Sequence, residues 1–180
     1  MSTRTLMTVE EFAQMIPAES EGFELLEGEL IPLSSGNPIH SEICSLMIQL
    51  LRNYFDQVRI GRALIEMDCR ITDSTVFRPD ISIFVGDRLN QIDRRKVPLP
   101  FAPDIAVEVL SPSEGFMDVN RKVSAYLQAG SCEVWLLDYG SVEILIKTNS
   151  GVRLLRGQDV LESPLLPGFT VSVSKLLAGF

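Results

Sequence analysis

Three charged residues lie in segments of this sequence whose surroundings are otherwise apolar, and the first is Glu108. It occupies the middle of the segment 104–110, whose nearly unbroken apolar run predicts a strand that is covered on both faces. Alternation along that strand places Glu108 on the face opposite to Val107 and Val109. Because a buried unpaired charge is very costly, this carboxylate requires a cation, a metal ion or strong hydrogen-bond donors. A salt bridge or an edge position would also satisfy the pattern.

Asp80 and Lys122 are the other two charged residues. Asp80 follows Pro79 and precedes an apolar strand, which is also an ordinary position for an aspartate. Lys122 shares the apolar stripe of a predicted helix over 117–129, so its amine either extends to the solvent edge or reaches a buried acid. Two carboxylates from two strands can hold a hard cation such as Mg²⁺ or Mn²⁺, which polarises a phosphoryl oxygen and lowers the pKa of a bound water. A nearby lysine can then orient the water or stabilise charge on the phosphate.

His40 and Glu24 are weaker candidates for the same site. His40, the only histidine, lies in the first turn of a predicted helix, where a surface or capping role is favoured although helix starts also attract anions. Glu24 alternates with apolar residues in a predicted hairpin strand. Its position fits an exposed side chain and an inward-facing one equally well.

The elements that must position these residues follow from periodicity and turn residues. A capping box of Thr8 and Glu11 predicts a short helix that ends at Pro17. A β-hairpin is predicted around Glu27-Gly28, and Asn37-Pro38 predicts the start of the longest helix. The remaining predicted elements are the helices 38–56 and 117–129, the hairpin strands 23–26 and 29–33, and the strands 60–72, 76–85, 104–110, 133–138, 142–148 and 152–155. This order predicts an α/β (α+β) fold in which a mixed central sheet is flanked by helices, with an N-terminal β-hairpin.

Composition excludes several protein classes. The 180 residues are 46% apolar and 22% charged, which fits one globular domain over residues 1–180. No apolar run is long enough to span a bilayer and no signal-peptide stretch follows the N-terminus, so we expect a cytoplasmic protein that does not bind membranes. Three scattered cysteines without C-x-x-C spacing predict buried free thiols and argue against a structural zinc site.

The net charge of −8 argues against nucleic acid as a partner, but its distribution weakens that argument. Residues 1–36 contain seven acidic residues and only one basic residue, so the excess is concentrated at one end. The long loop 86–103 contains a basic segment from Arg88 to Lys96 with four basic residues and one acidic residue. A solvated loop is the simpler interpretation of that segment, and a binding surface is the alternative.

The order of the motifs resembles the PD-(D/E)XK nuclease superfamily and, more closely, the Uma-type restriction endonuclease family. The resemblance extends over nearly the whole chain, and each short string is weak by itself. The matching stretches are Met7–Phe12, Phe23–Leu30, Arg78–Ser82 with its Pro79-Asp80, Ala106–Ser113 with its Glu108-Val109-Leu110, then Lys122 with Tyr126, Gly130 and Val134-Trp135, and finally Ser163–Phe169.

The resemblance implies a restriction-endonuclease-like core and a Mg²⁺- or Mn²⁺-dependent DNA endonuclease. It implies that Asp80 and Glu108 are metal ligands, that the carbonyl of Val109 also contacts metal, and that His40 and Glu24 face the site. The superfamily pattern places a lysine two residues after the acidic residue, whereas this chain has Leu110 there. The resemblance assigns the lysine role to Lys122 instead. Sequence-specific cleavage would most simply require a symmetric homodimer on a palindromic site.

The sequence is also compatible with a function of another class. A nuclease-fold protein that has lost catalysis could act as a binding or scaffold protein through the basic loop or an oligomer interface. The net negative charge and the missing E-x-K lysine favour that alternative. Divalent-cation-dependent turnover would distinguish the two.

Overall fold

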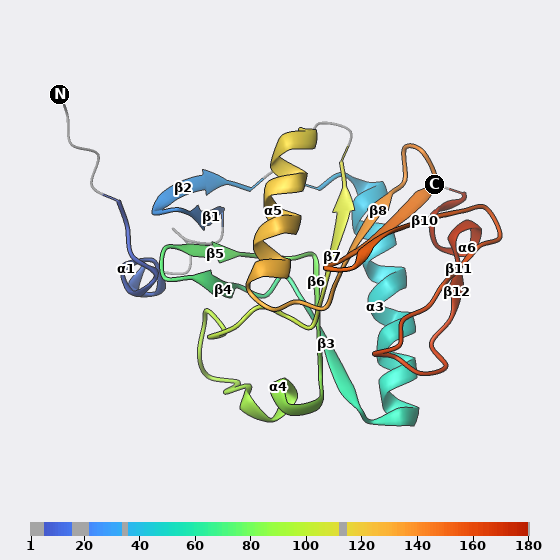
Figure 1. Cartoon of the computed structure of the whole chain (residues 1–180), viewed down its shortest axis with the longest axis horizontal. Helices are drawn as coiled ribbons and strands as arrows, with labels where there is room; N and C mark the ends of the chain where they lie inside the picture. Colours follow the sequence, from blue (N-terminus) through green and yellow to red (C-terminus); the bar gives the residue numbers. More distant parts are fainter. Residues whose placement is uncertain (1–5, 16–21, 34–35, 112–114, 180) are drawn as a thin grey trace.

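The N-terminal part of the chain forms a small antiparallel sheet. The structure is a computed structural model that describes residues 6–15, 22–33, 36–111 and 115–179. Helix α1 (Val9–Gln14) begins with the predicted capping box of Thr8 and Glu11 and ends at Gln14, earlier than predicted; Pro17, the predicted stop, lies outside the described residues. The predicted hairpin is confirmed as β1 (Phe23–Leu26) and β2 (Glu29–Pro32). It joins β5 (Thr75–Phe77) and β4 (Cys69–Thr72) in the order β2-β1-β5-β4 (Figure 1).

A six-stranded mixed sheet forms the centre of the molecule. Its order is β10-β9-β8-β7-β6-β3. The strands are β3 (Gly61–Ile65), β6 (Ile81–Val85), β7 (Ile105–Leu110), β8 (Glu133–Asp138), β9 (Glu143–Thr148) and β10 (Gly151–Arg156). Strands β7 and β8 are parallel, and helix α5 (Phe116–Gln128) connects them; the other described pairs of this sheet are antiparallel.

Helices cover both faces of this sheet, as the apolar run of the segment 104–110 predicts. Helix α3 (Pro38–Val58) packs on one face and helix α5 on the other (Figure 1). Side chains of β7 alternate between two cores: Val107 and Val109 pack with α3, and Ala106 packs with α5. Asn37 caps α3 by accepting the N–H of His40 at 2.9 Å, and Pro38 follows it, as predicted.

Two predicted strands are each divided between the two sheets. The segment 60–72 becomes β3 and β4, and the segment 76–85 becomes β5 and β6. Glu66 breaks the first with a φ of 47°, and Pro79, which has no N–H to donate to a ladder, lies in the second break. The N–H of Glu66 donates to the carbonyl of Asp80 at 3.1 Å. The two breaks are thus joined, and Asp80 lies at the junction between the sheets.

The loop and the C-terminal segment contain elements that periodicity does not predict. Residues 86–103 begin with α4 (Gly86–Gln91), which buries no side chain and therefore has no apolar stripe. After β10 come β11 (Val160–Leu161), β12 (Val171–Ser172) and α6 (Val173–Leu177), which packs against the α3 side of the core. None of the helices in the described ranges has both the length and the apolar character needed to span a membrane.

The cysteines are free, as predicted, but they are not all buried. Cys69 is buried and Cys44 is partly buried. Cys132 is exposed, which corrects the prediction of three buried thiols. It lies between Gly130 and the start of β8. Its backbone N–H donates to the carbonyl of Asp104, whereas its side chain is directed to solvent.

Candidate active site

The pairing of β6 with β7 brings the two acidic candidates to the same place. Ile81 pairs with Val107 in antiparallel register, and Asp80 and Glu108 are the next residues beyond that pair. The N–H of Val109 donates to Asp80 Oδ2 at 2.6 Å, so the backbone of β7 holds the aspartate directly. Asp80 and Glu108 therefore lie side by side on neighbouring segments: Glu108 is within β7, and Asp80 directly precedes the first residue of β6.

Glu108 is a buried carboxylate, as the sequence pattern predicts. It is 8% exposed and accepts a hydrogen bond from the hydroxyl of Tyr126 at 2.7 Å. Lys122 Nζ lies 3.6 Å from the same oxygen, Oε1. Burial raises the pKa of Glu108 to about 8, since Lys122 only partly offsets the burial and the charges of Asp80 and Glu24 add to it. A cation beside this carboxylate would relieve that penalty.

Lys122 reaches buried acids rather than extending to solvent. Its Nζ lies 2.9 Å from Glu24 Oε1 and 5.5 Å from the centre of the Phe77 ring. Burial alone would lower the pKa of Lys122, but Glu108 and Glu24 together outweigh it and raise the pKa above its usual value. The amine is therefore held in its charged form between two carboxylates.

Glu24 is the inward-facing alternative that the sequence left open. The residue is 5% exposed, and its Oε1 accepts the backbone N–H of Arg78 at 2.7 Å as well as the Lys122 amine. Arg78 in turn donates through Nε to Asp68 Oδ1 at 2.7 Å and through Nη2 to Asp68 Oδ2 at 3.0 Å. The hairpin strand β1 is thus tied to the segment that precedes Asp80.

His40 is the fifth predicted site residue and it lies on the α3 side of Asp80. His40 Nε2 is 3.2 Å from Asp80 Oδ1, and Nδ1 is 3.8 Å from Cys44 Sγ, one turn further along the helix. The hydrogen bond to Asp80 is the main reason that the pKa of His40 is raised to about 10. One ligand atom each from His40, Cys44 and Asp80 lie within 4.8 Å of one another.

The structure therefore offers two overlapping sets of possible metal ligands. The first consists of the oxygen donors of Asp80 and Glu108, which suit a hard cation. The second adds nitrogen and sulfur donors from His40 and Cys44 to Asp80. Sequence reasoning discounted a zinc cluster because the cysteines are scattered, whereas the fold brings Cys44 to Asp80 from a distant segment. Val109 contacts Asp80 through its N–H, and the role of its carbonyl stays a prediction.

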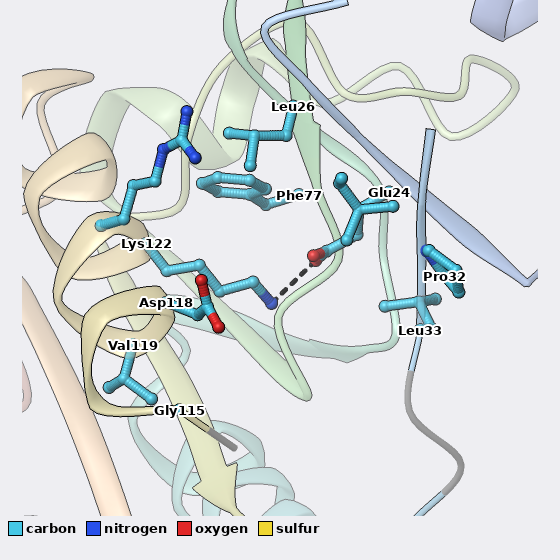
Figure 2. Close-up of a pocket in the computed structure, with 11 residues that line it drawn as sticks. Glu24, Leu26, Pro32, Leu33, Phe77, Gly115, Asp118, Val119 and Lys122 are labelled. Atoms are coloured by element: carbon cyan, nitrogen blue, oxygen red, sulfur yellow. Dashed lines mark ion pairs between the residues drawn. The ribbon is translucent and has the colours of Figure 1, made fainter. Parts of the chain in front are cut away.

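A cavity of about 260 Å³ adjoins the lysine (Figure 2). It lies between the hairpin β1–β2 and helix α5, and the Lys122–Glu24 ion pair is on its wall (Figure 2). Most of its lining is apolar. The lining residues are Glu24, Leu26, Ile31, Pro32, Leu33, Phe77, Gly115, Asp118, Val119, Arg121 and Lys122. The cavity gives solvent a route to the inner side of the hairpin next to the lysine amine.

Tyr126 is a candidate site residue to which sequence reasoning assigned no role, although it is among the residues that carry the family resemblance. It falls on the apolar stripe of α5 four residues after Lys122, where the pattern indicated only core packing. Its ring does pack against Phe77, with the centroids 5.5 Å apart, but its hydroxyl is aimed at Glu108. A tyrosine beside a lysine on a buried stripe was the available signal, because a buried hydroxyl requires a partner.

The basic segment is only partly a free surface. Arg88 donates to the carbonyls of Ala102 and Gly130, each at 2.7 Å, and Arg88 Nε lies 3.5 Å from Asp104 Oδ1. It therefore supports the fold rather than a partner. The exposed basic side chains that remain in this segment are Arg94, Arg95 and Lys96.

Comparisons with known proteins identify the family and the fold of the chain. The structure has the same fold as the crystal structure of a putative nuclease belonging to DUF820 from Anabaena variabilis, with a TM-score of 0.83. The two chains are 23% identical, and the match covers 96% of this chain and 98% of that one. A family model described as putative restriction endonuclease, Uma2, matches residues 9–174, and the chain belongs to that family. No curated protein matches the chain. The predicted family and fold class are confirmed, and the family supports a nuclease function.

Proposed function

We propose that this protein is a divalent-cation-dependent endonuclease that hydrolyses phosphodiester bonds of DNA. The observation that carries the proposal is the buried carboxylate of Glu108, which lies beside Lys122 and on the strand next to Asp80. A hard cation fits this donor set, because the pKa of Glu108 is raised by burial and the carboxylate lacks full compensation. When bound, such a cation would polarise the scissile phosphate and lower the pKa of the attacking water.

The residues of the chain would divide the remaining work. Asp80, Glu108 and the carbonyl of Val109 would hold Mg²⁺ or Mn²⁺. Lys122, kept charged by Glu24, would orient the attacking water and stabilise negative charge that develops on the phosphate. Tyr126 would keep Glu108 Oε1 occupied, so that the carboxylate presents its other oxygen.

His40 has a different part in this proposal. Its ring holds Asp80 Oδ1 in the cation-free protein, so cation binding at Asp80 would require the ring to release that oxygen. Cleavage at a symmetric DNA site would need a homodimer, which places two such centres on the two strands.

The direct test is cleavage of supercoiled plasmid, linear duplex and single-stranded DNA with Mg²⁺ and with Mn²⁺. Asp80→Asn, Glu108→Gln and Lys122→Met should each lower the rate by at least about a hundredfold, which corresponds to the loss of about 3 kcal/mol of transition-state stabilisation. Glu162→Gln is the matched control, because Glu162 is an exposed glutamate whose only ion pair in the described part of the chain is at 4.0 Å, with Arg153.

Two outcomes would contradict the proposal. A folded wild-type protein that cuts none of these substrates with either metal would favour the catalytically inactive binding or scaffold protein instead. Cutting that persists in Asp80→Asn at the wild-type rate would show that another nuclease is responsible.

A further inference from the structure

The ligand atoms around Asp80 include a thiol that an ordinary magnesium site does not use. Cys44 lies four residues after His40 on α3, which places both side chains on one face of the helix. Cys44 Sγ is 3.8 Å from His40 Nδ1, and His40 Nε2 is 3.2 Å from Asp80 Oδ1. The two contacts use different nitrogens of the ring, of which an ion would bind only one. One ring nitrogen, Cys44 Sγ and one Asp80 oxygen nevertheless lie within 4.8 Å of one another, and thiolate and imidazole are donors that zinc prefers.

The dimensions of this cluster suit a tetrahedral cation. Bond lengths of about 2.0–2.3 Å to nitrogen, oxygen and sulfur put the ligand atoms of a tetrahedral zinc site about 3.3–3.6 Å apart. The atoms of His40, Cys44 and Asp80 lie within 4.8 Å of one another, so small side-chain rotations would bring them to those separations. Three protein ligands leave a fourth position for solvent, and both His40 and Asp80 are partly exposed.

The surroundings of the cluster favour a cation as well. Asp80 Oδ2 is fixed by the N–H of Val109, which leaves Oδ1 aimed at the cluster. Asn37 caps the helix at the N–H of His40 and thereby fixes the first turn of α3. The negative charges of Asp80 and Glu66 both act on Cys44. A bound divalent cation would compensate these charges.

We propose that His40, Cys44 and Asp80 form a binding site for a borderline-soft divalent cation of the Zn²⁺ class, and that this site shares Asp80 with the hard-cation site, so that zinc and magnesium exclude each other. The shared-ligand part rests on the proposed function; the zinc site itself does not. Binding of zinc would release the thiol proton of Cys44 and any proton on His40. Zinc would then act as an inhibitor of the nuclease centre.

The zinc site is tested with Co²⁺, which replaces Zn²⁺ and reports a thiolate ligand by a charge-transfer absorption band. Metal-free wild-type protein should show this band at one equivalent of Co²⁺, and one equivalent of Zn²⁺ should abolish it. Cys44→Ser should lack the band and bind Zn²⁺ at least about tenfold more weakly. Cys132→Ser, which removes the exposed thiol, should behave as wild type. A band that is absent in wild type, or equal in Cys44→Ser, would overturn the proposal.

The exclusion is tested separately by Mn²⁺ binding, followed by electron paramagnetic resonance without any cleavage assay. One equivalent of Zn²⁺ should release bound Mn²⁺ from wild type, and the release should require more Zn²⁺ in Cys44→Ser. Mn²⁺ that stays bound to the zinc-loaded protein, or that does not bind the zinc-free protein, would overturn the shared-ligand part. Neither result would alter the cobalt measurement, and the cleavage assay tests the nuclease function independently of both.

Discussion

Lys122 is bound more closely by Glu24 than by Glu108: its Nζ lies 2.9 Å from the former and 3.6 Å from the latter. Glu24 belongs to β1 of the small sheet, whereas Lys122 belongs to α5, the helix on the central sheet (Figure 1). The ion pair therefore connects two parts of the fold and fixes the amine near the carboxylate of Glu108. Glu24 is best described as the residue that positions the lysine.

This arrangement makes the ion pair important for stability, because both partners are largely removed from water. Lys122→Met should destabilise the protein by about 3 kcal/mol, since it leaves Glu24 buried and uncompensated. The double variant with Glu24→Gln should recover at least about 1 kcal/mol of that loss, because the buried charge is then removed as well. Denaturant unfolding of the two single variants and the double variant measures this coupling.

The matched control for this cycle is Lys175→Met, which removes an exposed lysine on α6. Its free energy of unfolding should change by less than about 0.5 kcal/mol. Strictly additive effects of Lys122→Met and Glu24→Gln would contradict the close ion pair.

Tyr126→Phe tests the hydroxyl that holds Glu108. The variant keeps the ring that packs on Phe77 and deletes the donor to a buried carboxylate. We expect a loss of about 1–2 kcal/mol in the free energy of unfolding, because the acceptor is left without that partner. Binding of Mn²⁺ should weaken about tenfold, since the carboxylate loses the group that orients it. Calorimetry measures both effects.

Tyr54→Phe provides the comparison for that variant. Its hydroxyl donates to the carbonyl of Pro167 at 3.0 Å in an exposed hydrogen bond, and Tyr54 lies toward the opposite end of α3 from His40. Unchanged Mn²⁺ binding is expected there. Equal weakening in both tyrosine variants would indicate a general effect on the fold and would remove Tyr126 from the site.

Much of the fold could be predicted because local patterns and tertiary packing agree. The caps at Thr8 and Asn37 and the apolar run around Glu108 specified two helix starts and the buried strand correctly. The division of 60–72 and 76–85 between two sheets could not be predicted in the same way. A strand that leaves one sheet and enters another keeps its apolar alternation, and only Pro79 and the positive φ of Glu66 mark the breaks. The two-residue strands β11 and β12 are too short to produce a periodic signal.

Some residues of the candidate site could likewise be predicted from the sequence and others could not. Glu108 and Lys122 could be found because a charge on an apolar stripe conflicts with its surroundings, whether or not the partner is known. Cys44 could not be assigned to the site, because a cysteine on the margin of an apolar stripe conflicts with nothing. Its proximity to Asp80 depends on how α3 packs against the junction between the sheets, and the sequence holds no local signal for that.

The stability of the metal-free protein should fall as the pH rises from about 5 to 9. Burial raises the pKa of Glu108 to about 8 from its usual 4.5, so this group contributes stability that is fully present below pH 4.5 and is lost as the pH rises through 8. The pKa of His40 is raised from 6.5 to about 10, so the stability that its protonated form contributes is likewise lost as the pH rises from 6.5 to 10. The free energy of unfolding should fall by up to about 1.4 kcal/mol per pH unit for each of these protons. Denaturant unfolding in the presence of a chelator measures it.

Glu108→Gln should remove the part of this pH dependence that lies between about pH 5 and 8, because glutamine has no proton to lose. The hydroxyl of Tyr126 can still donate to the amide oxygen, so the variant should be at least as stable as wild type at pH 8 in the chelator. A slope as steep in Glu108→Gln as in wild type over this window would show that another group is responsible. Stability that rises with pH would refute the assignment altogether.

The three thiols should react with iodoacetamide in the order of their accessibility. At pH 8 Cys132 should react first because it is exposed. Cys44 should react more slowly, because it is partly buried and burial raises its pKa. Cys69 should stay unmodified in the folded protein, since it is buried and burial raises its pKa to about 12. Peptide mass spectrometry over a time course measures the three rates, and in denaturant the three should converge. Labelling of Cys69 as fast as that of Cys132 in the folded protein would contradict the packing of β4 against the central sheet, because only an opened core exposes that sulfur.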